Sequence, residues 1–130
     1  MQKVVIDTNI IISAAISDRG NPAKIMDLIS DRKLQMYYSE EIFVEYTEVL
    51  SRARFKFSLY KQEVILEKIK EIGTIIKPAV SEIEMPDETD RKFYDAARNI
   101  NAYLITGNIK HYPSEPLIMT PALFLTLIEN

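Results

Sequence analysis

The 130-residue sequence contains no cysteine, only three glycines and a single histidine, and it has no long apolar run. The absence of cysteine excludes a disulfide framework, a thiolate zinc site and a cysteine nucleophile. No stretch approaches the ~18 consecutive apolar residues of a membrane span. No basic leader with an apolar block precedes the first strand-like residues. We therefore expect a soluble, cytoplasmic protein that does not contact a membrane.

The remaining composition is that of an ordinary globular protein, with 47% hydrophobic and 27% charged residues. The length is close to that of a typical domain, so we expect residues 1–130 to form one domain. The net charge of −3 argues against binding nucleic acid through the overall field of the protein. It leaves open a metal ion held among carboxylates, because a bound cation reverses the local charge.

Apolar patterns typical of strands alternate along the chain with patterns typical of helices. The predicted strands are Lys3–Ile6, Leu34–Tyr38, Thr74–Ile76, Tyr103–Ile105 and Leu117–Met119. The predicted helices are Ile10–Ala15, one capped by Asn21, one capped by Ser39, Tyr60–Ile72, one capped by Asp87 and one opening at Thr120-Pro121. This alternation predicts a three-layer α/β/α domain with a mainly parallel central sheet.

In such a sheet, ligands bind beyond the carboxyl ends of the strands, and four polar residues are predicted there. Asp7 directly follows the first strand, and Asn108 follows the strand Tyr103–Ile105 across a Thr-Gly turn. Glu45 lies at the border of the apolar stripe of its helix, and Asp90 lies in the first turn of another helix, on its inward side. Each alone also fits a plain interpretation as a cap, a solvated side chain or a turn residue.

Together, these four residues bring several carboxylates from separate elements to one end of the sheet. Converging carboxylates repel one another and need a cation, and ligation by oxygen alone suits Mg²⁺ or Mn²⁺. Such a site polarises a phosphate and activates water for in-line attack. The residues by themselves therefore suggest metal-assisted phosphodiester hydrolysis.

Four segments carry a resemblance to a known family: Val4–Asn9, Ser39–Leu50, Asp90–Ala97 and Tyr103–Asn108. Because these four segments occur in this order, the chain resembles a PIN domain nearly end to end. Within that superfamily, it resembles the VapC-like toxins. The resemblance implies a Mg²⁺- or Mn²⁺-dependent endoribonuclease acting on single-stranded or structured RNA. It also implies the toxin of a toxin–antitoxin pair, with an antitoxin protein as partner, and a homodimer.

Carried over position by position, the resemblance places the acidic metal ligands of the family on Asp7, Glu45 and Asp90. It assigns supporting roles to the polar residues Thr8, Asn9 and Thr106. The fourth acidic position falls on Asn108, where the commoner form has aspartate, so this position contributes no charge. Asp95, further along the same helix as Asp90, is a candidate to compensate.

Two other features have competing interpretations. The single histidine, His111, fits a surface or packing residue better than a base. The basic stretch that follows the Ser39 helix fits a solvated helix end, and alternatively a surface that tracks RNA phosphates. The candidate RNA contacts are Arg52, Arg54, Lys56, Arg91 and Lys92.

Three classes of function follow from these observations. The first is the metal-dependent endoribonuclease, which needs the Asp7 carboxylate. The second is a non-catalytic RNA- or protein-binding module that kept the fold and lost the fourth ligand; it tolerates Asp7→Asn. A flavodoxin-like nucleotide or signalling domain is disfavoured, because the three glycines form no phosphate-binding loop. We favour the enzyme.

Overall fold

The computed structural model describes residues 1–129, and a five-stranded sheet lies at its centre. The strands are Gln2–Ile6 (β1), Leu34–Tyr38 (β2), Gly73–Ile75 (β3), Tyr103–Ile105 (β4) and Ile118–Met119 (β5). Their spatial order is β3-β2-β1-β4-β5, and all four pairings are parallel. The predicted parallel sheet is therefore confirmed.

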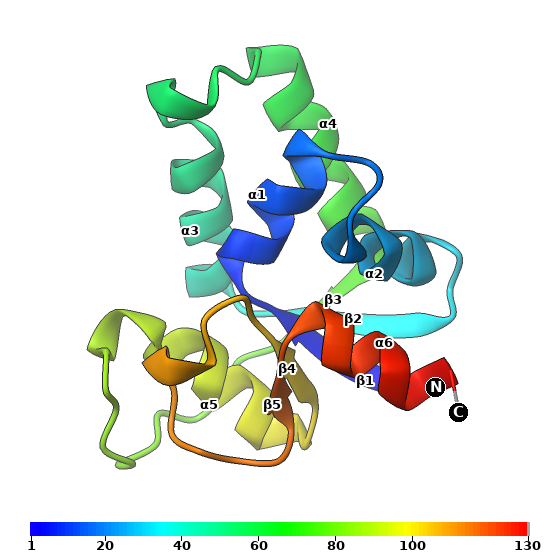
Figure 1. Cartoon of the computed structure of the whole chain (residues 1–130). Helices are drawn as coiled ribbons and strands as arrows, with labels where there is room; N and C mark the ends of the chain where they lie inside the picture. The colour runs from blue at the N-terminus through cyan, green and yellow to red at the C-terminus, as the bar shows by residue number, and fades with distance from the viewer. Residues whose placement is uncertain (130) are drawn as a thin grey trace.

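Within residues 1–129, helices connect these strands and cover the sheet on both sides. The α-helices are Thr8–Ile16 (α1), Asn21–Ser30 (α2), Glu40–Leu50 (α3), Leu59–Ile72 (α4), Arg91–Ile100 (α5) and Pro121–Glu129 (α6). Short 3₁₀ turns cover Ala53–Phe55, Glu88–Asp90 and Ile109–His111. In Figure 1, α5 lies on one side of the sheet and α2 and α6 lie on the other, which gives the predicted three layers. None of these helices is long and apolar enough to cross a membrane.

The core forms on both faces of the central strand, β1. Val4, Val5 and Ile6 of β1 are fully buried, as expected for a strand without a solvated face. On α5, Phe93 and Ala96 are fully buried, and this helix packs against β1, β2 and β4. The apolar pattern of α5 thus turns one side of this helix to the sheet and fixes where its first turn lies.

Several predicted helix boundaries are wrong by a residue or more. Asn21 is the first residue of α2, and Gly20 is its cap. Asp87 caps the 3₁₀ turn that precedes α5, where its side chain accepts a hydrogen bond from the backbone N–H of Thr89. The α-helix itself begins at Arg91. The tighter turn replaces the first helical turn, so Asp90 becomes the residue that leads into α5.

Other boundaries shift by smaller steps. The helix Tyr60–Ile72 begins at Leu59, and the strand placed at Thr74–Ile76 begins at Gly73. The helix after Ser39 ends at Leu50, with the following residues continuing into the 3₁₀ turn. Ser39 caps that helix as predicted, because its Oγ accepts a hydrogen bond from the N–H of Ile42.

The chain changes direction across the sheet next to β1. From β1 it moves to β2 and β3 on one side, and then crosses to β4 and β5 on the other. A crevice forms beyond the carboxyl ends of strands at such a switch point. Ile6 pairs with Ile105, and the N–H of Asp7 donates to the carbonyl of Ile105 at 3.0 Å. Asp7 and Thr106 therefore enter this crevice side by side.

Gly73, between α4 and β3, sits where the backbone passes very close to its neighbours. A Cβ atom at this position would lie 2.9 Å from the carbonyl oxygen of Ile69 and 2.9 Å from the ring of Tyr38. Gly73→Ala is expected to lower the free energy of unfolding by about 1–3 kcal/mol, because the backbone must shift to admit the methyl group. Urea titration measures this change.

Gly20→Ala is the matched control for Gly73→Ala. A Cβ atom at Gly20 would meet only Pro22 Cδ, at 3.5 Å, which is an ordinary contact. Its effect is expected to stay below about 1 kcal/mol. Equal losses of stability in the two variants would contradict the packing explanation for Gly73.

Candidate metal centre

The first carboxylate of the site, Asp7, is buried at the end of β1 and fully supplied with hydrogen-bond donors. Its Oδ2 accepts from the hydroxyls of Thr106 and Tyr112, both at 2.8 Å, and the backbone N–H of Thr8 donates to its carboxylate as well. Burial raises the pKa of Asp7, and these hydrogen bonds offset part of the rise. The charge of Glu45 adds to it. Asp7 is thus held in a fixed position that disfavours its charge.

The second carboxylate, Glu45, reaches the crevice from the middle of α3. Thr8 Oγ1 donates to one of its oxygens, and the ammonium of Lys92 lies 2.9 Å from the other. The side chains of Lys92 and Glu45 are only 18% and 23% exposed. Thr8 therefore supports Glu45 with its side chain and Asp7 only through its backbone. Lys92, considered as an RNA contact, lies inside the site.

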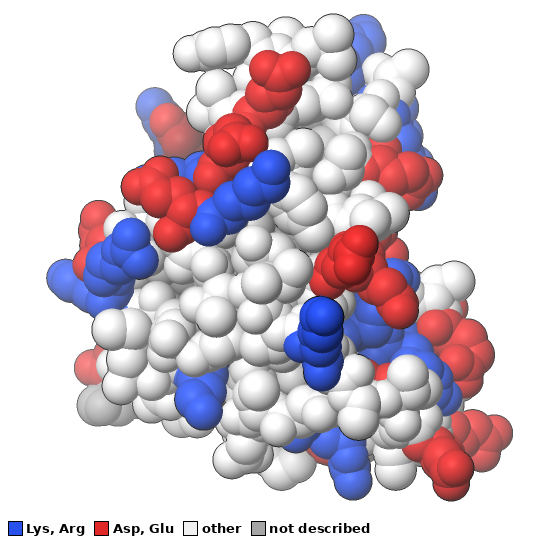
Figure 2. All heavy atoms as spheres, turned by 180° about the vertical axis from the view of Figure 1, so that it is seen from behind, with Lys and Arg blue, Asp and Glu red and all other residues white. Residues whose placement is uncertain are grey.

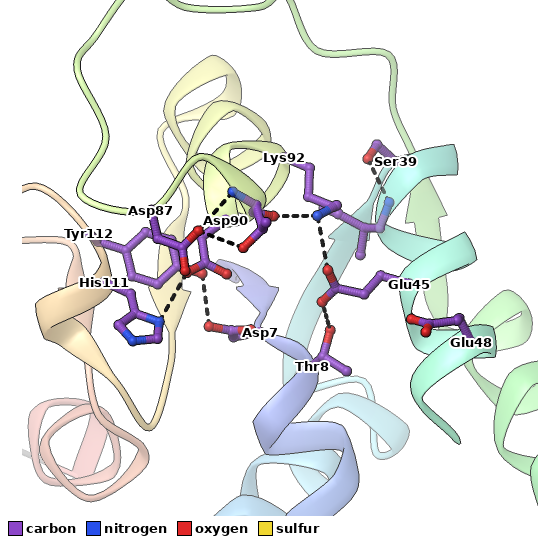
Figure 3. A network of polar contacts seen from close by, with 12 residues as sticks. Asp7, Thr8, Ser39, Glu45, Glu48, Asp87, Asp90, Lys92, His111 and Tyr112 are labelled. Carbon is purple, nitrogen blue, oxygen red and sulfur yellow. Dashed lines mark hydrogen bonds and ion pairs between the residues drawn. The ribbon is translucent and has the colours of Figure 1, made fainter. Parts of the chain in front are cut away.

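The third carboxylate, Asp90, stands in a group with Asp87 and His111, as Figure 3 shows. Asp90 Oδ2 lies 3.1 Å from His111 Nδ1. One possible ligand atom from each of these three residues lies within 4.8 Å of the other two. Burial, together with the charges of Asp7 and Asp87, raises the pKa of Asp90 to about 6, against a smaller opposing effect of His111.

Asn108 and its turn close the site on the side of β4. Its side-chain nitrogen lies 2.8 Å from His111 Nε2, and its backbone N–H donates to Thr106 Oγ1 at 3.0 Å. The side-chain oxygen of Asn9 accepts from the N–H of Gly107 at 3.1 Å, which ties the start of α1 to this turn. Asn9 and Thr106 thus hold the turn that presents Asn108.

Asp95, the residue considered as a replacement for the fourth acid, is buried in α5, five residues after Asp90. Its Oδ2 accepts from the backbone N–H of Ser81 at 3.1 Å, and its Oδ1 has no hydrogen-bond partner within residues 1–129. It lines the same cleft as Glu45 and Lys92. This side-chain hydrogen bond ties Asp95 to Ser81, in the segment that precedes α5.

The basic stretch beyond α3 lies apart from the carboxylates. Arg52 pairs with the exposed Glu48 at 3.2 Å, and the guanidinium of Arg54 lies over the ring of Phe55. Arg52, Arg54 and Lys56 all lie beyond Leu50, where α3 ends, whereas Glu45 lies in the middle of that helix. On the face in Figure 2, basic and acidic side chains alternate and form no continuous basic field.

Arg91 holds the segment that precedes the 3₁₀ turn. Its guanidinium donates to the carbonyls of Ser81 and Ile83, at 2.9 and 2.6 Å, and pairs with Glu88 at 2.8 Å. Arg91→Met is expected to speed proteolytic cleavage between residues 80 and 86 about tenfold, because two part-buried carbonyls lose their donor. Limited proteolysis followed by mass spectrometry measures this rate.

Arg52→Met is the control for Arg91→Met, because it removes the same group from an exposed ion pair, which contributes little to stability. Its cleavage rate between residues 80 and 86 should equal that of the unchanged protein. Equal acceleration by both variants would mean that Arg91 does not hold this segment.

Sequence reasoning missed the roles of Tyr112 and His111. Tyr112 donates to Asp7 across 105 residues, and no local pattern marks such a contact. A signal for His111 exists, because residues three apart lie above one another in a 3₁₀ turn, which brings His111 to Asn108. Predicting the 3₁₀ turn Ile109–His111 after the Thr-Gly turn would therefore have placed the histidine beside Asn108.

The donor set fits a hard divalent cation. Asp7, Asp90 and Asp87 supply carboxylate oxygens. Burial is the main cause of the raised pKa values of Asp7 and Asp90, and the charges of neighbouring carboxylates add to it. A cation among them would relieve this repulsion. The group formed by Asp87, Asp90 and His111 has the spacing that such an ion requires.

Comparisons with known proteins identify the family. A family model described as PIN domain matches residues 3–110. An uncharacterized protein of Methanocaldococcus jannaschii is 38% identical over 109 residues, which cover 82% of this chain and 70% of that protein. The crystal structure of VapBC2 from Rickettsia felis bound to a promoter DNA fragment superposes with a TM-score of 0.61 at 16% identity, covering 92% of this chain and 97% of that one. The chain thus has the fold predicted from its resemblance to VapC-like proteins, and it belongs to the PIN domain family.

Proposed function

We propose that this protein is a metal-dependent endoribonuclease that hydrolyses RNA phosphodiester bonds in the cytoplasm. The observation that carries the proposal is the convergence of Asp7, Glu45 and Asp90, from three elements, on the crevice beside β1 (Figure 3). The chain belongs to the PIN domain family. Because resemblance to this family implies a metal-dependent nuclease, the membership supports the same activity.

Asp7, Glu45 and Asp90 would form the carboxylate set that holds Mg²⁺ or Mn²⁺. Such an ion, when bound, polarises a phosphate and lowers the pKa of water. Thr106 and Tyr112 would keep the Asp7 ligand in position, because their hydroxyls donate hydrogen bonds to its carboxylate. Asn108 supplies an uncharged amide at the rim, able to orient water by hydrogen bonds.

The shape around the site fits a continuous strand. A cleft of about 790 Å³ opens beside Glu45 and Lys92 between α3 and α5. A second hollow of about 560 Å³ opens on the other side, beside Asn9 and Asn108. A chain that leaves the site in both directions is the substrate of an endonuclease. With a net charge of −3 and no basic field on the face in Figure 2, we expect recognition to rely on contacts at the site.

The experiment that tests this function is cleavage of a mixed-sequence single-stranded RNA and of an RNA hairpin with Mn²⁺, Mg²⁺ or EDTA. Cleavage with either ion and none with EDTA is the expected result, with products that carry a 5′-phosphate and a 3′-hydroxyl. Failure to cut either RNA, with RNA or protein binding intact, would overturn the nuclease. It would favour the binding module, which the uncharged Asn108 supports.

We further propose that the protein is the toxin of a toxin–antitoxin pair. The resemblance to VapC-like toxins supports this role, and the superposed Rickettsia felis structure is that of VapBC2 bound to promoter DNA. An antitoxin would cover the crevice and offer a basic side chain to the carboxylates. Addition of that partner is expected to suppress RNA cleavage at a one-to-one ratio, which a titration of the cleavage assay measures.

The proposed homodimer has a candidate surface at the adjoining ends of α1 and α4. Ile16, Leu59, Tyr60 and Val64 are exposed there, and Lys61 Nζ joins the two helices through the carbonyl of Ala15 at 2.7 Å. Tyr60→Glu is expected to convert a dimer to a monomer in sedimentation analysis, because it places a charge in an apolar contact. A mass unchanged by this substitution would place the dimer contact elsewhere.

A further inference from the structure

The carboxylates of the site fall into two groups that differ in how their charge is balanced. Glu45 is supplied on both oxygens, by the hydroxyl of Thr8 and by the ammonium of Lys92 at 2.9 Å. Lys92 is also bound to the carbonyl of Thr89, so its position between α3 and the 3₁₀ turn is fixed. A cation of the protein itself therefore already occupies the Glu45 side of the site.

In the other group, no lysine or arginine of the described residues forms an ion pair with Asp87 or Asp90, and the charge of Lys92 acts on Asp87 without direct contact. Asp90 and Asp87 face each other near Asp7, and their neighbour is the imidazole of His111. His111 Nδ1 and Asp90 Oδ2 lie at hydrogen-bond distance from each other, 3.1 Å. The same separation suits two adjacent ligands of one ion, because bonds of about 2.1 Å at right angles put ligand atoms about 3 Å apart. One possible ligand atom from each of the three residues lies within 4.8 Å of the other two, so the three are close enough to contact one ion.

Asn108 is placed to orient this histidine. A histidine that binds a metal through Nδ1 must carry its proton on Nε2, and a carbonyl oxygen usually accepts that proton. The Asn108 amide lies 2.8 Å from Nε2, and turned about its Cβ–Cγ bond it offers its oxygen there. An aspartate is thus not required at position 108 for a complete ligand set. His111 itself lies past residue 110, where the match to the family model ends.

We propose that the carboxylates hold one divalent ion, on the Asp90 side, with His111 Nδ1 as a ligand beside Asp90 and Asp87. The Lys92 ammonium stands at Glu45 in place of a second ion. This inference rests on the metal site of the proposed function and refines it: Glu45 acts as the partner of Lys92. A nitrogen ligand also shifts the preference of the site from Mg²⁺ toward first-row transition ions.

Counting bound ions tests the role of Lys92. Mn²⁺ titration of the full chain, followed by electron paramagnetic resonance of free Mn²⁺, is expected to give one ion for the unchanged protein and two for Lys92→Met. Lys110→Met, which removes a positive charge from an exposed residue of the same region, is the control and is expected to keep one. Two ions in the unchanged protein, or one in Lys92→Met, would overturn the proposal.

The single histidine makes the second part directly observable. With any purification tag removed, the ring nitrogens of His111 are the only histidine signals in a long-range ¹H–¹⁵N spectrum. Zn²⁺ is expected to shift Nδ1 to the value of a metal-bound nitrogen, with the proton on Nε2. His111→Ala is expected to lower Zn²⁺ affinity more than tenfold and Mg²⁺ affinity less than twofold. Unshifted ring signals in the Zn²⁺-loaded protein would show that His111 is not a ligand.

Neither measurement uses RNA, so the two proposals fail separately. One bound ion with a shifted His111 signal supports the ligand set even where no RNA is cut. RNA cleavage by a protein that binds two ions and leaves His111 unshifted would support the nuclease and contradict the ligand set.

Discussion

Asp90→Asn is expected to make the metal-free protein more stable at pH 7.5 while it removes RNA cleavage. Burial and the charges of Asp7 and Asp87 raise the pKa of Asp90 from 3.8 to about 6. The folded protein therefore favours the protonated carboxyl, and its ionised form is held at a cost. Asparagine keeps the shape and removes the charge, so the variant escapes this cost and loses a metal ligand.

The direction of the pH dependence follows from the raised pKa. The contribution of Asp90 to stability is fully present below pH 3.8 and is lost as the pH rises toward about 6. The pKa difference sets an upper limit of about 3 kcal/mol, and solvent near the 14%-exposed side chain reduces this to about 1 kcal/mol. In EDTA, Asp90→Asn should therefore gain about 3 °C in Tm at pH 7.5 and much less at pH 4.

Asp87→Asn is the matched control, because Asp87 lies three residues away and its pKa is shifted in the opposite direction. Hydrogen bonds from Thr89 lower the pKa of Asp87, so its ionised form is favoured in the folded protein. Its contribution is present above the ordinary pKa of 3.8 and is lost as the pH falls below it. This variant should gain no stability at pH 7.5. A gain equal to that of Asp90→Asn would contradict the assigned charge environment.

The sequence was sufficient for those parts of the site that periodicity and strand order control. Asp7 follows a fully apolar strand, and parallel pairing carries it to the same edge as Thr106. Glu45 lies three residues from Ile42 and one from Tyr46, both fully buried, so helix geometry alone puts it at the margin of the core. These positions depend on local patterns that hold in any sheet of this type.

The sequence was insufficient where contacts between distant residues decide the role of a side chain. Lys92 follows Asp90 by two residues and fits an exposed basic residue, but it binds Glu45, which lies 47 residues earlier. The Glu88–Asp90 turn causes this difference, because it lets the chain enter α5 later than a helix capped at Asp87 would. The residue at which α5 begins decides where the Lys92 side chain points, and no local helix propensity determines that residue.

Asp7→Asn and Tyr112→Phe are expected to separate the charge of the first carboxylate from the hydrogen bond that positions it. Asp7→Asn should lower metal-dependent RNA cleavage on the order of 10³-fold, because it removes a charged ligand. Its stability should equal or exceed that of the unchanged protein, since the buried position disfavours the charge. The hydroxyls of Thr106 and Tyr112 accept as well as donate, so they accommodate the amide. Cleavage rates and urea unfolding measure the two effects.

Tyr112→Phe keeps the charge and removes only one of the two hydroxyls on Asp7 Oδ2. Cleavage is expected to fall about 10- to 100-fold, as is usual for the partner of a metal ligand. Because this hydrogen bond lowers the pKa of Asp7, its loss should also move the acidic limb of the pH–rate profile to higher pH, which a merely structural defect does not do. Tyr103→Phe, whose ring packs on Phe124, is the control and should leave rate and profile unchanged. A slower Tyr112→Phe enzyme with an unshifted profile would show that Tyr112 does not act through Asp7.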